Sequence, residues 1–119
     1  MAEATDDGGA DGPESIARAY YDALDGGDYD ALASLLAPEF VQRRPDRTFE
    51  GREAFVRFMR EGRPNPDTRH ELREVVGDEG RVAVRGRLLD RESGAELLAF
   101  ADHFAVADGR IVRIETYTR

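Results

Sequence analysis

The spacing of hydrophobic residues predicts three helices in the first half of the chain. Over residues 14–24 apolar side chains recur every three or four positions, and the pair Gly26-Gly27 ends this pattern. Asp28 is a candidate N-cap for a second helix, which Pro38 would stop. A third helix is expected after Gly51, with its apolar residues on one side, and Gly62 and Pro64 would close it.

After residue 67 the apolar period changes to two, which is the period of half-buried strands. Four strands are predicted, at residues 68–76, 81–89, 97–106 and 110–118, and the turns between them are rich in Gly and Asp. A short strand is also expected at residues 40–44. Helices followed by an antiparallel meander predict an α+β fold, in which a curved, mainly antiparallel sheet wraps around the N-terminal helices.

Strand alternation places a carboxylate, Asp102, on a face that should pack against the helices. The other residues of this face are large and apolar: Leu98, Phe100, Phe104 and Val106. Because a buried carboxylate without partners is costly, Asp102 is expected to be paired, protonated or functional. Gly86 lies on the corresponding face of the neighbouring strand, where its missing side chain either leaves room for a cavity or marks a bulge.

Length and composition limit the class of protein. The 119 residues fit one domain, and the absence of Cys excludes disulfides, Cys-ligated metals and thiol catalysis. Residues 1–13 are acidic, Gly-rich and poor in apolar side chains, so we expect a disordered tail there and a folded domain over residues 14–119. The tail resembles neither a signal peptide nor a transit peptide, and no apolar run could cross a membrane, so a cytoplasmic protein is expected.

Charge changes the expected partners. The formal net charge is −8, and an acidic body repels phosphate backbones, which argues against nucleic-acid binding. Every basic side chain is Arg, and an acidic chain without Lys suggests adaptation to high salt; a GC-rich genome is the alternative explanation. The two histidines, His70 and His103, are far apart and no paired Asp spacing occurs, so no metal site is predicted.

Four segments of the chain share a pattern with a known group of proteins. They are residues 19–28 (AYYDALDGGD), residues 35–40 (LLAPEF), Phe49-Glu50-Gly51, and Asp102-His103-Phe104 with the following Asp108-Gly109-Arg110. In these segments the chain resembles the nuclear-transport-factor-like superfamily, which includes ketosteroid isomerases, SnoaL-like polyketide cyclases and dehydratases. The resemblance covers residues 14–119 and implies a cone with an internal pocket. It is specific for fold and not for function, because this fold carries many chemistries.

The resemblance assigns roles to single residues. Tyr20 matches the ketosteroid isomerase tyrosine that donates to the substrate oxyanion, and Asp102 matches the acid beside it. The position of the general base is Arg44, which cannot take a proton at neutral pH, so ordinary ketosteroid isomerisation is not expected. Arg44 is instead expected to form an ion pair with Asp102 across the pocket. If the two do not meet, Asp102 is a neutral acid available to a ligand.

A second set of candidates follows the dehydratase branch of the superfamily. His70, in Thr68-Arg69-His70, resembles the strand histidine that acts as a general base there, and Asp22 or Asp25 would be its partner. A packing role for His70 is the plainer alternative. Tyr20 could equally be a core aromatic residue, and Tyr21 is expected to point elsewhere, as a packing or surface residue.

These observations predict a small-molecule-binding protein without a cofactor. It would be an isomerase, cyclase or dehydratase acting on an apolar ring or carbonyl compound, or a non-catalytic module in which Arg44 binds an anionic ligand, or a dimeric protein-interaction module. The resemblance implies a homodimer through the outer sheet face, although arginines and Glu115 make that face polar. The catalytic candidates are Tyr20, Asp102 and His70. The predicted ligand-binding residues are Gln42, Arg44, Phe55, Met59, Val84, Leu88, Phe100, Ile114 and Thr116.

Overall fold

A computed structural model describes residues 12–119. The predicted tail, residues 1–13, lies outside the described residues except for its last two positions. The helices are α2 (Pro13–Gly26), α3 (Tyr29–Leu35) and α4 (Arg52–Arg57), which continues as a π-helical turn, η1 (Phe58–Gly62). The strands are β1 (Leu36–Arg43), β2 (Thr48–Glu50), β3 (Thr68–Asp78), β4 (Arg81–Asp90), β5 (Glu96–Ala107) and β6 (Arg110–Thr118). The α+β class predicted from the sequence is confirmed.

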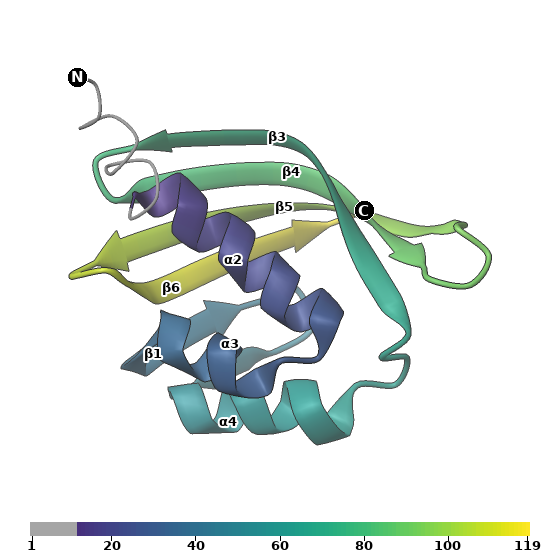
Figure 1. Ribbon diagram of the computed structural model, residues 1–119, viewed down its shortest axis with the longest axis horizontal. Coiled ribbons are helices and arrows are strands. Elements are labelled where there is room, and N and C mark those ends of the chain that lie inside the picture. The colour runs from purple at the N-terminus through teal and green to yellow at the C-terminus, as the bar shows by residue number, and fades with distance from the viewer. Residues whose placement is uncertain (1–11) are drawn as a thin grey trace.

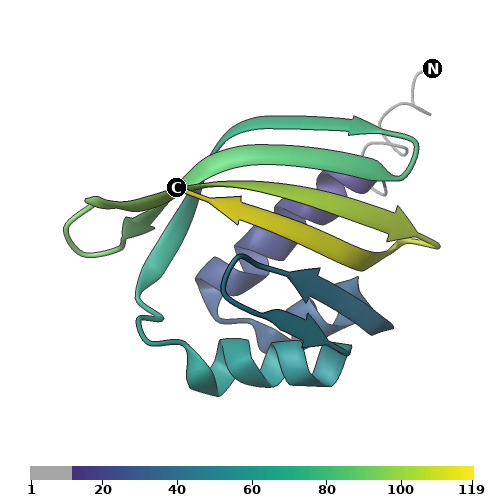
Figure 2. The same ribbon diagram turned by 180° about the vertical axis from the view of Figure 1, so that it is seen from behind.

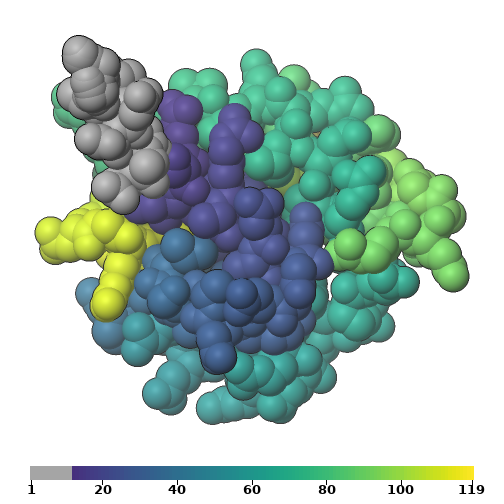
Figure 3. Space-filling view, in the orientation of Figure 1, coloured from purple at the N-terminus to yellow at the C-terminus, as the bar shows by residue number. Residues whose placement is uncertain are grey.

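The strands form one curved sheet in the order β2-β1-β6-β5-β4-β3. All neighbours are antiparallel except β1 and β6, which run parallel. The helices lie on one face of this sheet (Figure 1), and α2 and α3 fill the centre of the molecule's surface on that side (Figure 3). Seen from behind, strands β3 to β6 are not covered by helices (Figure 2). The sheet therefore has one face against the helices and one open face.

Local sequence explains where the helices end. Gly27 follows α2 with φ +67°, a left-handed conformation that glycine adopts without strain. Asp28 then caps α3, since its carboxylate accepts a hydrogen bond from the Ala31 N–H at 3.1 Å. Strand β1 begins directly after α3 and includes Pro38, which lies in a register shift between Leu36 and Val41 where it need not donate to the sheet.

The face assignments made from strand alternation hold in the middle of β5, but Leu97, which alternation assigns to the outer face, lines the same cavity as Leu98 beside a register shift. Phe100, Asp102 and Phe104 are buried, whereas His103 is exposed on the opposite face. The bulge explanation for Gly86 is also supported: β3 shifts register opposite it, and a Cβ there would lie 2.3 Å from the Glu71 backbone oxygen. Gly86 is therefore required for the close approach of β3 and does not make room for a cavity.

Among residues 12–119, no helix is both long and apolar enough to cross a membrane.

Candidate functional site

A cavity of about 380 Å³ opens between the helical layer and the concave sheet face. Its size is in the usual range for small-molecule sites. Apolar side chains make up much of its wall: Leu24, Phe58, Met59, Leu88, Leu97, Leu98 and Phe100. The polar groups on the wall are Tyr20, Gln42, Arg44, Arg63, Asn65, Thr68, His70, Asp102, Thr116 and Thr118.

Most of the predicted pocket residues lie on this wall, but three do not. Phe55, Val84 and Ile114 belong to the hydrophobic core beneath the cavity, and each is at most 2% exposed. Phe55 packs against Phe40 and Phe49, with ring centroids 4.9 and 5.7 Å away. Alternation identified the inward face correctly, but it could not separate the part of that face that helices cover from the part left open.

Asp102 is 5% exposed and accepts two short hydrogen bonds. The Tyr21 hydroxyl donates to Oδ2 at 2.5 Å, and the Thr116 hydroxyl donates to Oδ1 at 2.6 Å. Burial raises the pKa of Asp102, and these two donors, with the charges of His70 and Arg44, oppose that rise only in part. Asp102 therefore holds a proton more tightly than a solvated carboxyl group does.

The predicted ion pair between Arg44 and Asp102 is wrong. Arg44 donates from Nε to Asp46 at 3.1 Å, and its guanidinium lies over the rings of Phe49 and Phe58, 5.9 and 6.0 Å from their centroids. Asp46 is two residues further along the same loop, so this local pair forms without crossing the pocket. The charge of Arg44 reaches Asp102 only as a minor influence on its pKa.

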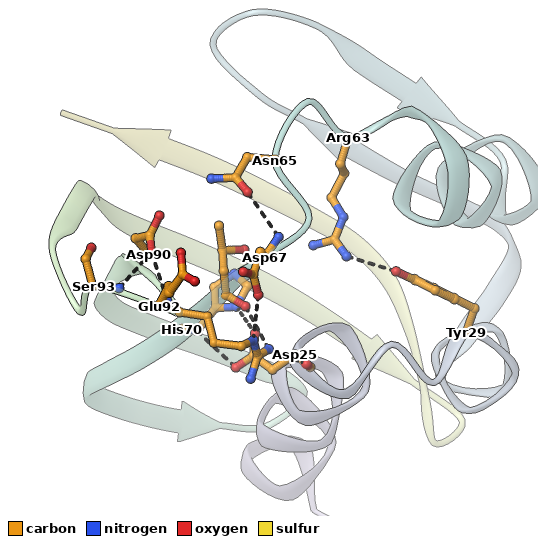
Figure 4. Close-up of polar contacts among 11 residues, drawn as sticks. Asp25, Tyr29, Arg63, Asn65, Asp67, His70, Asp90, Glu92 and Ser93 are labelled. Atoms are coloured by element: carbon orange, nitrogen blue, oxygen red, sulfur yellow. Dashed lines mark hydrogen bonds and ion pairs between the residues drawn. The ribbon is translucent and has the colours of Figure 1, made fainter.

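His70 on β3 is held in one orientation by Asp25, which lies near the end of α2 (Figure 4). Asp25 Oδ1 lies 2.7 Å from His70 Nδ1, and Asp25 Oδ2 accepts from the His70 backbone N–H at 3.0 Å. A carboxylate can only accept, so Nδ1 carries a proton, and in the neutral form of the imidazole the lone pair is on Nε2. Of the two aspartates that the sequence left open as partners, the structure brings Asp25 to His70.

The adjacent tyrosines of α2 have different surroundings. Tyr21, expected to point elsewhere, is 2% exposed, donates to Asp102 and packs 5.0 Å from the His70 ring. Tyr20 lines the cavity, and within residues 12–119 its hydroxyl makes no hydrogen bond. Burial, followed by the charge of Asp102, raises the pKa of Tyr20, so it remains a proton donor.

Gln42 extends the polar chain from Asp102. Its Nε2 donates to Thr116 Oγ1 at 3.0 Å, while its buried Oε1 has no hydrogen-bond partner within residues 12–119. Gln42 is 5% exposed, so the unpaired acceptor lies away from bulk water. Hydrogen bonds therefore run from Gln42 through Thr116 to Asp102, and one acceptor of Gln42 is left open.

Sequence reasoning missed several residues of the cavity wall, and among them Arg63 carries a positive charge. Arg63, Pro64, Asn65 and Thr68 belong to the connection between η1 and β3 and to the first residue of β3. A connection has no periodicity to indicate which side chains turn inward. Within residues 12–119 no group of three or more His, Asp or Glu side chains could hold a metal ion.

Comparison with known proteins agrees with this fold. The model of the SnoaL-like domain matches residues 17–114. Among solved structures, a candidate ketosteroid isomerase from Kribbella flavida superposes with a TM-score of 0.79 at 25% identity, over 90% of this chain and 77% of that one.

Two further structures are similar over most of their length. A candidate polyketide cyclase from Sinorhizobium meliloti gives a TM-score of 0.75 at 27% identity, over 87% of this chain and 94% of that one. An NTF2-like protein of unknown function from Mesorhizobium loti gives 0.75 at 28% identity, over 90% of each chain. Among curated proteins, none matches the chain. With 98 of 119 residues inside the family match, this chain belongs to the SnoaL-like domain family.

Proposed function

We propose that the protein binds a small molecule with an apolar ring and a carbonyl group, and moves a proton on it without a cofactor. The single observation that carries this proposal is the His70–Asp25 pair on the wall of the cavity. A histidine whose Nδ1–H is fixed by a carboxylate presents Nε2 as a base, and general bases of this kind act near neutral pH.

The other polar groups supply what proton abstraction next to a carbonyl requires. Removal of that proton leaves negative charge on the carbonyl oxygen, and a hydrogen-bond donor aimed at this oxygen stabilises it. Tyr20 has an unused hydroxyl on the cavity wall and a raised pKa, so it is our candidate donor. Asp102, which holds its proton tightly, is the candidate second acid.

Two neighbouring structures described as a candidate ketosteroid isomerase and a candidate polyketide cyclase support this reaction class. Both descriptions name a keto compound, a ketosteroid or a polyketide. The proposal differs from ordinary ketosteroid isomerisation in the base, since Arg44 stands where that enzyme has its carboxylate, and His70 takes over the proton transfer from another strand.

The test uses 2-tetralone, an apolar bicyclic ketone whose protons next to the carbonyl exchange in heavy water. We expect the protein to accelerate this exchange, followed by proton NMR. We expect His70→Gln to reduce the protein-dependent rate by roughly a hundredfold or more, the usual contribution of a general base. Asp25→Asn should cause a smaller loss, because it frees the ring orientation but leaves the imidazole in place.

His103→Gln is the matched control, since it removes the other histidine, which is exposed on the open face of the sheet. It should exchange tetralone at the wild-type rate. The proposal would be rejected if His70→Gln matched the wild type. It would also be rejected if the wild type did not exceed the buffer rate while NMR line broadening showed tetralone bound.

A further inference from the structure

Among the residues that the structure describes, the cavity wall carries two arginines, and only one of them forms an ion pair. Arg44 forms an ion pair with Asp46 at 3.1 Å. Arg63 lines the same cavity, and none of the carboxylates in residues 12–119 forms an ion pair with it. A cation without a partner on the wall of a largely apolar cavity is an unused anion-binding group.

Arg63 is positioned by neutral contacts that leave most of its donors available (Figure 4). Its Nε donates to the Met59 carbonyl oxygen at 3.0 Å, and one terminal nitrogen donates to the Tyr29 hydroxyl at 2.9 Å. A guanidinium has five N–H donors, so three remain. The side chain is only partly exposed, and two of its contacts already restrict its rotation, which lowers the entropy lost on binding a ligand.

The nearby acidic groups have other partners. Asp67, four residues further along the chain, pairs with Arg91 at 3.4 Å. Asp25 accepts from His70, and Asp102 accepts from Tyr21 and Thr116. The charge of Arg63 acts on the Tyr20 hydroxyl, so Arg63 and this proposed oxygen-binding group belong to one site.

We propose that the ligand of this cavity carries a carboxylate group, which Arg63 binds while the apolar body of the ligand packs against the leucine, phenylalanine and methionine walls. This inference rests on the proposed function for the choice of site, and it adds the substrate class: an aromatic or alicyclic carboxylic acid. One unpaired arginine matches one carboxylate, because the planar guanidinium can donate to both carboxylate oxygens at once.

The test compares two probes of the same shape, 2-naphthoate and its neutral amide, 2-naphthamide. Isothermal titration of the wild-type protein should show naphthoate binding roughly tenfold or more tightly than naphthamide, as expected for charge-assisted hydrogen bonds. Added salt should weaken naphthoate binding and leave naphthamide binding unchanged. Equal affinities for the two probes in the wild type would overturn the proposal without any variant.

Variants locate the effect at one side chain. Arg63→Gln should remove the preference for naphthoate, and Arg63→Lys should keep part of it, because Lys retains the charge but not the planar fork. Arg60→Gln is the matched control: it removes the same charge three residues earlier, in η1, where Arg60 is exposed, contacts the Tyr29 ring and does not line the cavity. A loss of preference as large in Arg60→Gln as in Arg63→Gln would show a general charge effect and refute the assignment.

His70→Gln separates this inference from the proposed function. It should bind naphthoate as the wild type does, because the base takes no part in holding the carboxylate. In the wild type, a preference for naphthoate without tetralone exchange would reject the catalytic proposal alone. Tetralone exchange without a preference for naphthoate would reject only the proposal that the ligand carries a carboxylate.

Discussion

Removal of the Tyr21 hydroxyl measures how much the hydrogen bond from Tyr21 to the buried Asp102 contributes to stability. Tyr21→Phe keeps the ring, which packs 5.1 Å from Tyr20 and 5.8 Å from Phe104, and deletes only the oxygen that donates to Asp102. The substitution therefore changes hydrogen bonding with little change in packing. Asp102 keeps the Thr116 donor, so its Oδ1 is still satisfied.

The expected loss depends on the charge of Asp102. A hydrogen bond to an ionised group contributes about 1.5–3 kcal/mol to stability, whereas a neutral one contributes about 1 kcal/mol. The Tyr21 donor also opposes the burial that raises the pKa of Asp102, so its removal raises that pKa further. Each unit of pKa corresponds to about 1.4 kcal/mol.

The sign of the pH dependence follows from the raised pKa. Between the ordinary pKa of Asp and the folded pKa of Asp102, the native state binds more protons than the unfolded state, so stability falls as pH rises through this interval. Tyr21→Phe widens the interval. The free energy of unfolding lost by the variant should therefore be about 1 kcal/mol while Asp102 is protonated, and about 1.5–3 kcal/mol once it is ionised.

Urea unfolding, measured at several pH values from about 5 to 9, checks this expectation. Tyr117→Phe is the control: Tyr117 is 55% exposed, and removal of its hydroxyl should cost nothing at any pH. In an Asp102→Asn background the cost of Tyr21→Phe should fall to that of a neutral hydrogen bond. A cost that is independent of pH and unchanged by Asp102→Asn would refute the reasoning.

Three other expectations concern the cavity, the surface and the medium. Gln42→Met removes both a hydrogen bond to Thr116 and an unpaired buried acceptor, so chemical denaturation should show a stability change between zero and about 2 kcal/mol in favour of the variant. A homodimer through the outer sheet face is expected. Light scattering over a protein concentration series should show it, and Ala101→Asp on that face should shift it toward monomer. Because the acid excess is large and Lys is absent, thermal melting temperatures should rise in molar KCl. Flat or falling values would leave a GC-rich genome as the explanation for the missing Lys.

The main elements of the fold could be predicted because their signals are local. Period-two alternation predicts β3 to β6, and Asp28 marks the start of α3. Strand β2 has only three residues, too few for a period, and the parallel pairing of β1 with β6 joins segments about 70 residues apart, which no local pattern indicates. Pro38 predicts that the second helix stops before it, and α3 does end at Leu35, but the sequence does not show that Pro38 lies inside β1, at an irregularity in the ladder.

The sequence predicts those residues of the candidate site that lie on one face of a single strand. Alternation placed Asp102 on the inner face, and the structure keeps it there at 5% exposure. The partners of Asp102 could not be predicted, because they depend on how α2 lies across the sheet. Tyr20 and Tyr21 are about 100° apart around the helix, and both point inward because the sheet curves around α2. The expected contact between Arg44 and Asp102 is absent, because Arg44 pairs with Asp46, an acid in its own loop.

The two proposed functional groups are seven residues apart: Arg63 follows η1, and His70 is the third residue of β3. Each residue is held by a hydrogen bond between a side chain and the backbone: Arg63 Nε donates to the Met59 carbonyl oxygen, and the His70 N–H donates to the Asp25 carboxylate. Arg91 adds a third attachment, since it donates to the carbonyl oxygens of Thr68 and Asp25 at 2.9 and 2.5 Å. The separation of the base from the cation is thus fixed by the fold. A ligand whose carboxylate is held by Arg63 can present only those protons to His70 that lie at the matching distance, and this positional restriction would select one carbon of the ring for proton transfer.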